Sequence, residues 1–289
     1  MKPAPFEYHA PETIADVVAL LAEHGDEIKP LAGGQSLVPM LALRLTRFEH
    51  LVDLNRVAEL DGLRRDNGTL TVGATTRQAT IERSAQAEAG PLLARAAPLI
   101  GHFQIRNRGT VGGSLAHADP AAELPAVALA LDARMEIATS TARHTVPASD
   151  FFVGTWTTSL EPTELLTAVQ FPVWDGRCGF VVDEVARRAG DFALAGVTAG
   201  LQLDASGAIA RAAIALFGMA GTPVRATVAE VALIGSRPDP AALREIADLA
   251  VRDLEPPDDV HASSTYRRSV GRHLVERGLT RALDEAHHA

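Results

Sequence analysis

The chain has 289 residues, 47% of them hydrophobic, and a formal net charge of −9 at pH 7. This length allows two or three subdomains with separate cores, and the negative charge argues against nucleic acid or an anionic membrane surface as the main partner. No apolar run approaches the roughly 18 residues of a transmembrane segment, no signal-like stretch follows Met1, and Cys178 is the single cysteine. We therefore expect a soluble cytoplasmic protein that has no disulfide and no iron–sulfur cluster of its own.

The first third of the chain alternates helix and strand patterns. Apolar residues recur at helical spacing after Pro11 and Thr13, and Gly25 is a suitable C-terminal stop. A glycine pair, Gly33-Gly34, follows the first predicted strand, and open α/β sheets usually bind ligands at such strand ends. The expected elements are a helix that opens at 11–13 and stops at Gly25, strands over 28–31 and 51–54, and a short helix over 37–45.

The rest of the chain predicts antiparallel strands and further helices. Asn67-Gly68 fits a tight hairpin turn, and residues 175–177 resemble a linker. The last third predicts three strands backed by helices, which is an independent α+β unit. The expected strands are 70–74, 135–138, 145–146, 165–171, 179–186, 195–203 and 209–217, and the expected helices are 76–84, 91–100, 120–131, 227–233, 240–251 and 264–281.

Two glycine loops are the main candidates for a ligand site: 31–37, which contains Gly33-Gly34, and 109–115, which contains Gly112-Gly113. Glycines let the backbone turn with positive φ and approach a ligand closely, and successive amides suit a phosphate oxygen. The chain has no G-x-G-x-x-G and no Walker loop. The two loops therefore predict a diphosphate held from two sides by amides and neutral side chains, without a cation. Either pair alone could be a structural turn.

Several longer blocks resemble the FAD-binding medium subunits of molybdenum hydroxylases, the family that contains carbon monoxide dehydrogenase and xanthine dehydrogenase. The first glycine loop resembles the family's first flavin loop. A long block from Gln104 to Ser114, continued by 117–120 and 123–125, resembles the family's second flavin loop. Residues 187–193 and 264–268 resemble the family's C-terminal domain. The resemblance covers nearly the whole chain.

The resemblance implies an α+β fold in two main parts. The first is a PCMH-like FAD-binding domain over 1–175, built of two α/β subdomains at about 1–57 and 58–175. The second is the C-terminal domain of the medium subunit, over 178–289, with a three-stranded antiparallel sheet and helices. We expect FAD to be bound without a covalent bond, because the first loop lacks the histidine or cysteine that attaches the flavin in some relatives.

The resemblance also implies the residues that contact FAD. Asp119 and Glu123 correspond to the ribityl and ribose region, Leu166 to an aliphatic neighbour of the flavin, and Phe192 to an aromatic residue near the ring. No catalytic residue and no metal ligand are expected in this chain. The full set is Leu31, Ala32, Gly33, Gly34, Gln35, Ser36, Leu37, Thr110, Val111, Gly112, Gly113, Ser114, Asp119, Glu123, Leu166 and Phe192.

The function that the resemblance implies is electron relay. A large subunit with a molybdenum–pterin centre oxidises the substrate, and a small subunit carries two [2Fe–2S] clusters that pass electrons to the FAD of this chain. An external acceptor then takes them. The expected assembly is a dimer of heterotrimers. The substrate (carbon monoxide, a purine, an N-heterocycle or an aldehyde) and the acceptor (NAD, a quinone, a cytochrome or oxygen) stay open.

Other interpretations stay open at this stage. Residues 112–116 nearly match the G-x-S-x-G elbow, which would make Ser114 the nucleophile of a serine hydrolase, although the charged segment 104–108 does not fit the strand that precedes an elbow. A standalone flavin reductase and an assembly module without cofactor are further alternatives. His117 with Asp119 could form an acid–base pair or simply support the second loop. Residues 266–268 fit a solvated or capping helix face.

Overall fold

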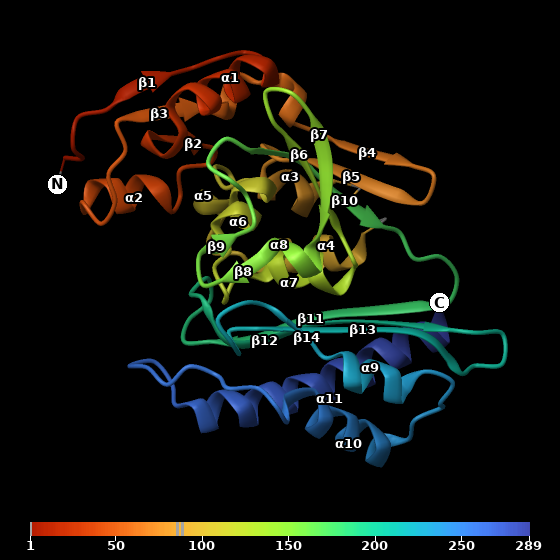
Figure 1. The fold of residues 1–289 in the computed structure, drawn as a ribbon. Helices are drawn as coiled ribbons and strands as arrows, with labels where there is room; N and C mark the ends of the chain where they lie inside the picture. Colours follow the sequence, from red (N-terminus) through yellow and green to blue (C-terminus); the bar gives the residue numbers. More distant parts are fainter. Residues whose placement is uncertain (1, 85–86, 88–89) are drawn as a thin grey trace.

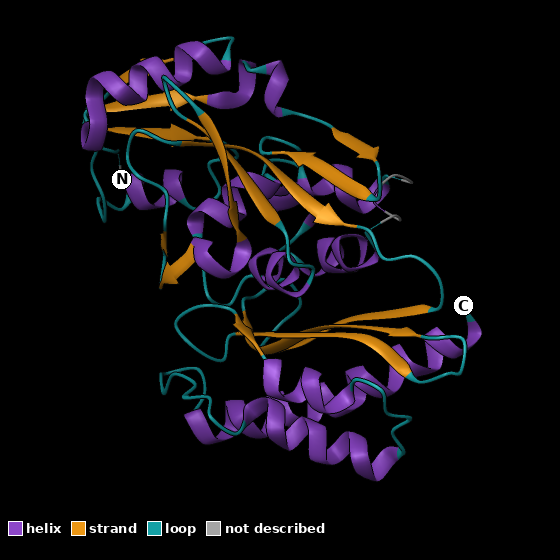
Figure 2. Ribbon diagram, turned by 45° about the vertical axis from the view of Figure 1, so that its right-hand side comes forward, coloured by secondary structure: helices purple, strands orange, loops and turns teal. Residues whose placement is uncertain are grey.

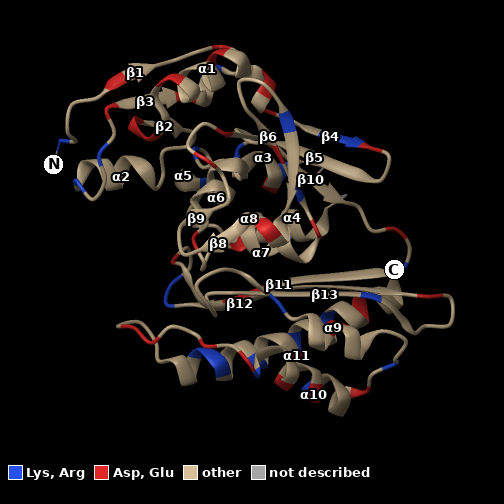
Figure 3. Cartoon of the chain, in the orientation of Figure 1, with Lys and Arg blue, Asp and Glu red and all other residues tan. Residues whose placement is uncertain are grey.

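The computed structural model describes residues 2–84, 87 and 90–289. Within these residues the chain forms three units that follow one another in sequence and in space, each built on its own sheet (Figure 1). Figure 3 shows that acidic and basic residues are spread over all three units. In the described part of the chain, no helix is both long and apolar enough to cross a membrane.

The N-terminal unit is a parallel sheet in the order β1-β3-β2. Helix α1 packs its apolar stripe on this sheet, and the stripe is buried as the spacing of its residues predicts. The Thr13 side chain caps the helix by accepting from the Asp16 N–H, and Gly25 ends it with a φ of 52°. The elements are β1 (Glu7–His9), α1 (Ile14–His24), β2 (Ile28–Leu31), α2 (Leu37–Ala42) and β3 (His50–Asp53).

The middle unit is an antiparallel sheet in the order β4-β5-β10-β6-β7. Its first hairpin turns at Asn67 and Gly68, both with positive φ, as the dipeptide predicts. The strands are β4 (Leu63–Asp66), β5 (Thr69–Gly73), β6 (Arg134–Ala138), β7 (Arg143–Pro147) and β10 (Leu165–Pro172), and a small hairpin adds β8 (Phe152–Gly154) and β9 (Thr157–Thr158). The helices are α3 (Gln78–Arg83), α4 (Pro91–Ala96), α5 (Phe103–Arg106), α6 (Val111–His117), α7 (Glu123–Ala130) and α8 (Ala148–Phe151).

The C-terminal unit is an antiparallel sheet in the order β11-β12-β13-β14. Helices α9 and α11 pack on its outer face and α10 packs against both of them, while α4 and α7 lie between this sheet and the middle unit (Figure 2). The elements are β11 (Cys178–Ala186), β12 (Ala193–Leu203), β13 (Ile209–Phe217), β14 (Val224–Arg225), α9 (Thr227–Leu233), α10 (Pro240–Val251) and α11 (Ser264–His288). Short 3-10 turns cover Gly25–Glu27, Leu54–Arg56, Ala58–Leu60 and Ala97–Leu99.

The α+β fold class is confirmed. The structure also contains short elements that the sequence analysis did not predict, among them β1, β8, β9, α5 and α8, and it differs from the expectation in three further respects. The C-terminal sheet has a fourth strand, because the two-residue β14 pairs with β13. The second glycine pair lies inside a helix, α6, rather than in a loop. Arg267 does not lie on a solvated face: it is 4% exposed, because its guanidinium donates to the Leu194 and Gly218 carbonyl oxygens and pairs with Asp259.

Candidate functional site

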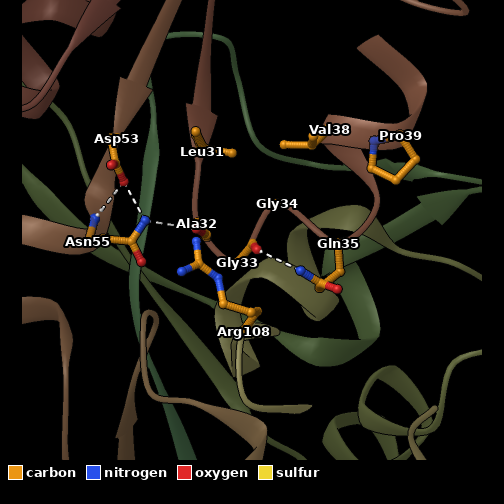
Figure 4. Close-up of a pocket in the computed structure, with 10 residues that line it drawn as sticks. All are labelled: Leu31, Ala32, Gly33, Gly34, Gln35, Val38, Pro39, Asp53, Asn55 and Arg108. Atoms are coloured by element: carbon orange, nitrogen blue, oxygen red, sulfur yellow. Dashed lines mark hydrogen bonds between the residues drawn. The ribbon is translucent and has the colours of Figure 1, made fainter. Parts of the chain in front are cut away.

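The first glycine loop forms one wall of a cavity of about 340 Å³ (Figure 4). The loop follows β2, and β2 pairs in parallel with β3, so the carboxyl ends of both strands meet at one edge of the sheet. The start of α2 and the segment before α6 complete the cavity. The residues that line it are Leu31, Ala32, Gly33, Gly34, Gln35, Val38, Pro39, Asp53, Asn55 and Arg108.

The backbone N–H groups of this loop are available to a ligand. In the described part of the chain, the N–H groups of residues 33–36 have no hydrogen-bond acceptor. The carbonyl groups, in contrast, are held: the Gln35 side chain donates to the Gly33 oxygen at 3.1 Å, and the Asn55 side chain donates to the Ala32 oxygen at 3.0 Å. Gly34 turns the chain with a φ of 72°. This arrangement of free donors suits an anionic group such as a phosphate.

The two glycine loops lie against each other. A Cβ on Gly33 would overlap the Arg108 carbonyl oxygen and would lie 2.8 Å from the Cα of Gly109. A Cβ on Gly113 would lie 3.5 Å from the Cβ of Ala32. The absence of a side chain at Gly33 therefore lets the second loop approach the rim of the cavity.

The sequence analysis expected the second glycine loop to offer free amides to a ligand. This expectation was wrong, because the N–H groups of residues 111–113 are paired within the protein. The N–H groups of Val111 and Gly112 donate to the carbonyl oxygens of Thr76 and Ala74. The Gly113 N–H donates to the Thr110 side chain, which caps α6. Gly112 is required for close packing, because a Cβ there would lie 2.7 Å from the Ala74 Cα. The cause is tertiary packing, which converts a loop-like glycine pair into the first turn of a helix.

Arg108 is a cavity residue that the sequence analysis did not select. Its side chain lies beside Ala32 and Gly33 in Figure 4 and lines the cavity. Its carbonyl oxygen accepts a hydrogen bond from the Arg77 guanidinium. The cavity therefore contains a cationic side chain that the sequence analysis did not include. The sequence contained a signal for it, because Arg106 and Arg108 directly precede the second glycine block.

The cavity lining also contains a carboxylate, that of Asp53. The Tyr8 hydroxyl and the Asn55 side chain both donate hydrogen bonds to it. Burial works against ionisation, but these hydrogen bonds outweigh it, so the pKa of Asp53 lies below its ordinary value. The cavity thus offers amides and a guanidinium for an anion, and a carboxylate that could accept from ligand hydroxyl groups.

Asp119 and Glu123 follow α6 in the chain and do not line the cavity of the first loop. Asp119 accepts from the Ala121 N–H at 2.9 Å and from the Trp156 indole N–H at 3.2 Å. Glu123, the first residue of α7, is buried, and burial raises its pKa to about 8. Burial also raises the pKa of Glu184 to about 7. These carboxyl groups form a separate acidic cluster.

The remaining predicted contact residues are also outside the cavity lining. Leu166 is buried in β10, whereas Phe192 is 63% exposed just before β12. Ser114 lies within helix α6 and not on a strand-to-helix turn, so the geometry does not support a nucleophile elbow. His117 stacks on Trp156, and burial lowers its pKa.

Comparison with known protein families matches both parts of the chain. Residues 4–174 match the family described as the FAD binding domain in molybdopterin dehydrogenase. Residues 181–282 match the CO dehydrogenase flavoprotein C-terminal domain. The chain therefore contains an FAD-binding domain.

Individual relatives align with nearly the whole chain. The chain is 42% identical to the 6-hydroxypseudooxynicotine dehydrogenase complex subunit alpha of Paenarthrobacter nicotinovorans, covering 99% of this chain and 97% of that one. It is 37% identical to the carbon monoxide dehydrogenase medium chain of Hydrogenophaga pseudoflava, covering 98% of each. A solved carbon monoxide dehydrogenase from H. pseudoflava, which lacks the Mo-pyranopterin moiety, superimposes with a TM-score of 0.96, 38% identity and 99% coverage of both chains. Quinoline 2-oxidoreductase from Pseudomonas putida 86 superimposes with a TM-score of 0.93 and 37% identity, covering 99% of both chains.

Proposed function

Because the chain belongs to the family of FAD-binding medium subunits of molybdenum hydroxylases, we propose that it passes electrons from [2Fe–2S] clusters of a partner subunit through FAD to an external acceptor. The chain is an oxidoreductase subunit, since its relatives are subunits of dehydrogenase complexes. The proposed partners are a large molybdopterin subunit and a small iron–sulfur subunit, assembled as a dimer of heterotrimers. The single cysteine supports this division, because cluster ligation needs about four thiolates. It also fits a reducing compartment, and we propose the cytoplasm.

The observation that carries the proposal is the set of free N–H groups at residues 33–36. We infer that they bind the FAD diphosphate, because a row of unpaired amides stabilises phosphate oxygens. Arg108 adds a positive charge at the same cavity, and a guanidinium forms strong hydrogen bonds with phosphate. When bound, FAD would supply a centre that accepts electrons singly and releases them in pairs. The residues therefore fit this cofactor.

The second loop has a different role in this proposal. Helix α6 packs closely against Ala74, which follows β5, because Gly112 has no side chain. We infer that this packing positions Thr110, Ser114 and the Arg108 segment around the ligand. Asp119, Glu123 and Leu166 remain proposed contacts for the ribityl and ring regions. The exposed Phe192 is proposed to contact the ring from the C-terminal part, residues 178–289, which we treat as a domain separate from 1–175.

The proposal is tested on the complex purified with its co-expressed subunits. We expect one FAD per copy of this chain, together with iron and molybdenum on the co-purifying subunits. After acid precipitation, FAD should be found in the supernatant. Flavin that stays with the precipitated chain would refute non-covalent binding. A flavin-containing chain that purifies without iron–sulfur and molybdenum subunits would refute the relay.

A further inference from the structure

Three histidines from three different elements gather in the N-terminal unit. His9 ends β1, His24 ends α1 and His50 begins β3. Each offers a ring nitrogen, and these nitrogens all lie within 4.8 Å of one another. The three side chains are half-buried. The fold, and not a histidine-rich segment, therefore brings these rings together.

The spacing of the rings suits a shared metal ion. The His9 Nε2 lies 3.1 Å from the His50 Nδ1. Two nitrogens that bind one tetrahedral zinc at about 2.0–2.1 Å stand roughly 3.3 Å apart. The ring of His24 stacks on His50 with centroids 3.9 Å apart, and its ring nitrogen lies within 4.8 Å of the other two ligand atoms.

The surroundings also favour a cation. The Glu7 carboxylate lies 3.5 Å from the His50 Nδ1, within reach of a fourth coordination position. His24 lies at the C-terminal end of the 11-residue helix α1, and the negative end of a helix dipole stabilises positive charge. Without an ion, one of the two close ring nitrogens of His9 and His50 has to carry a hydrogen and donate a hydrogen bond to the other. An ion between them would use both lone pairs.

We propose that His9, His24 and His50 form a binding site for a divalent transition-metal ion such as Zn²⁺. Imidazole nitrogens favour zinc, copper and nickel over the hard ions magnesium and calcium. Three histidines with Glu7 or a water complete a tetrahedral zinc shell. The sequence analysis expected no metal ligand. His9 and His50 are 41 residues apart, which matches no short metal-binding motif.

Such an ion would stabilise the edge of the N-terminal sheet. The three-residue β1 pairs only with β3 in the described sheet, and the ion would tie it to α1 as well. The neighbouring Tyr8 donates a hydrogen bond to Asp53, which lines the cavity of the first glycine loop. The metal site is therefore connected to the cavity through two consecutive residues of β1.

The test is zinc titration of the full-length, FAD-loaded protein after removal of metals with a chelator, followed by calorimetry. We expect one Zn²⁺ per chain in the wild type and at least tenfold weaker binding in His24→Gln and in His50→Gln. Substitution with Co²⁺ should give the visible absorption of tetrahedral coordination in the wild type, and this absorption should be lost in both variants. Zinc should also raise the Tm of the wild type, because an ion that binds the folded state stabilises it.

The control is the double variant His287→Ala/His288→Ala, which removes adjacent exposed histidines at the end of α11. It should bind zinc like the wild type. The proposal is wrong if the wild type does not bind zinc saturably. It is also wrong if both single variants keep wild-type affinity while the C-terminal control loses it.

Discussion

Gly33 lies so close to the backbone of Arg108 that any side chain at position 33 would overlap the Arg108 carbonyl oxygen. Two residues that are 75 positions apart in sequence thus line the same cavity. The first glycine loop supplies its free amides, and the segment that contains Arg108 supplies its cation. Changes on either side should therefore alter the same ligand site.

Replacing Gly33 with alanine should weaken FAD binding and lower the free energy of unfolding by about 1–3 kcal/mol, because the new methyl group forces the two segments apart. Urea denaturation and the FAD content of the purified protein measure the two effects. Gly154→Ala is the control, since its Cβ would meet its nearest atom at 3.7 Å. If Gly33→Ala keeps full flavin content, the close approach is not needed for binding.

Replacing Arg108 with glutamine should lower the affinity for FAD about ten- to hundredfold, since a hydrogen bond to a charged group contributes roughly 1.5–3 kcal/mol. Arg108→Lys should keep part of the affinity. Salt should weaken binding more in the wild type than in Arg108→Gln, because salt screens the charge. Fluorescence titration of the flavin-free protein measures these affinities.

The exposed Arg143 in β7 provides the matched control. Arg143→Gln makes the same change in net charge away from the cavity, and its affinity for FAD should equal that of the wild type. An equal loss in both variants would mean that overall charge, and not the position of Arg108, determines the affinity.

The buried Glu123 should make stability depend on pH. Its pKa is about 8 in the folded protein, against an ordinary value of 4.5. Between these values the folded state holds a proton that the unfolded state has lost, so the free energy of unfolding should fall as pH rises, by about 1.4 kcal/mol per pH unit. Stability from this group is complete below about pH 4.5 and is lost as the pH rises through about 8.

Glu123→Gln isolates this contribution, since glutamine does not titrate. Its stability relative to the wild type, measured by urea denaturation, should rise steadily between about pH 5 and pH 8. Glu245→Gln, at an exposed position of α10, should keep the wild-type pH profile. A Glu123→Gln profile parallel to that of the wild type would show that Glu123 is ionised throughout this range.

Local signals in the sequence predicted most of the elements. Helix α1 follows from its cap at Thr13, its apolar stripe and its stop at Gly25, and the first hairpin follows from Asn67-Gly68. Local signals were insufficient where tertiary packing decides. Gly112 and Gly113 look like a loop, because glycine pairs usually interrupt helices. Contact with Ala74 and the cap by Thr110 make them helical.

The same limit applies to the candidate site. The first loop was predictable, because glycines after a strand indicate close approach to a ligand. The positions of Arg108 at the cavity and of His9 beside His50 depend on contacts between distant segments. No local pattern encodes such contacts. Arg267 was misjudged for a related reason: its charge and helical position predict exposure, whereas its hydrogen-bond acceptors come from other strands and loops.

Arg267 and its neighbour Arg268 allow a direct test of what burial contributes. Arg267 donates to the Leu194 carbonyl oxygen at 2.6 Å and to the Gly218 oxygen at 3.2 Å, and it pairs with Asp259 at 2.8 Å. Arg267→Met would leave these acceptors without their donor, which should lower the free energy of unfolding by about 1–3 kcal/mol. Arg268 is exposed, so Arg268→Met should change it by less than about 0.5 kcal/mol. Thermal and urea denaturation of both variants should give this order, and equal losses would show that helix α11 is not held to the sheet through Arg267.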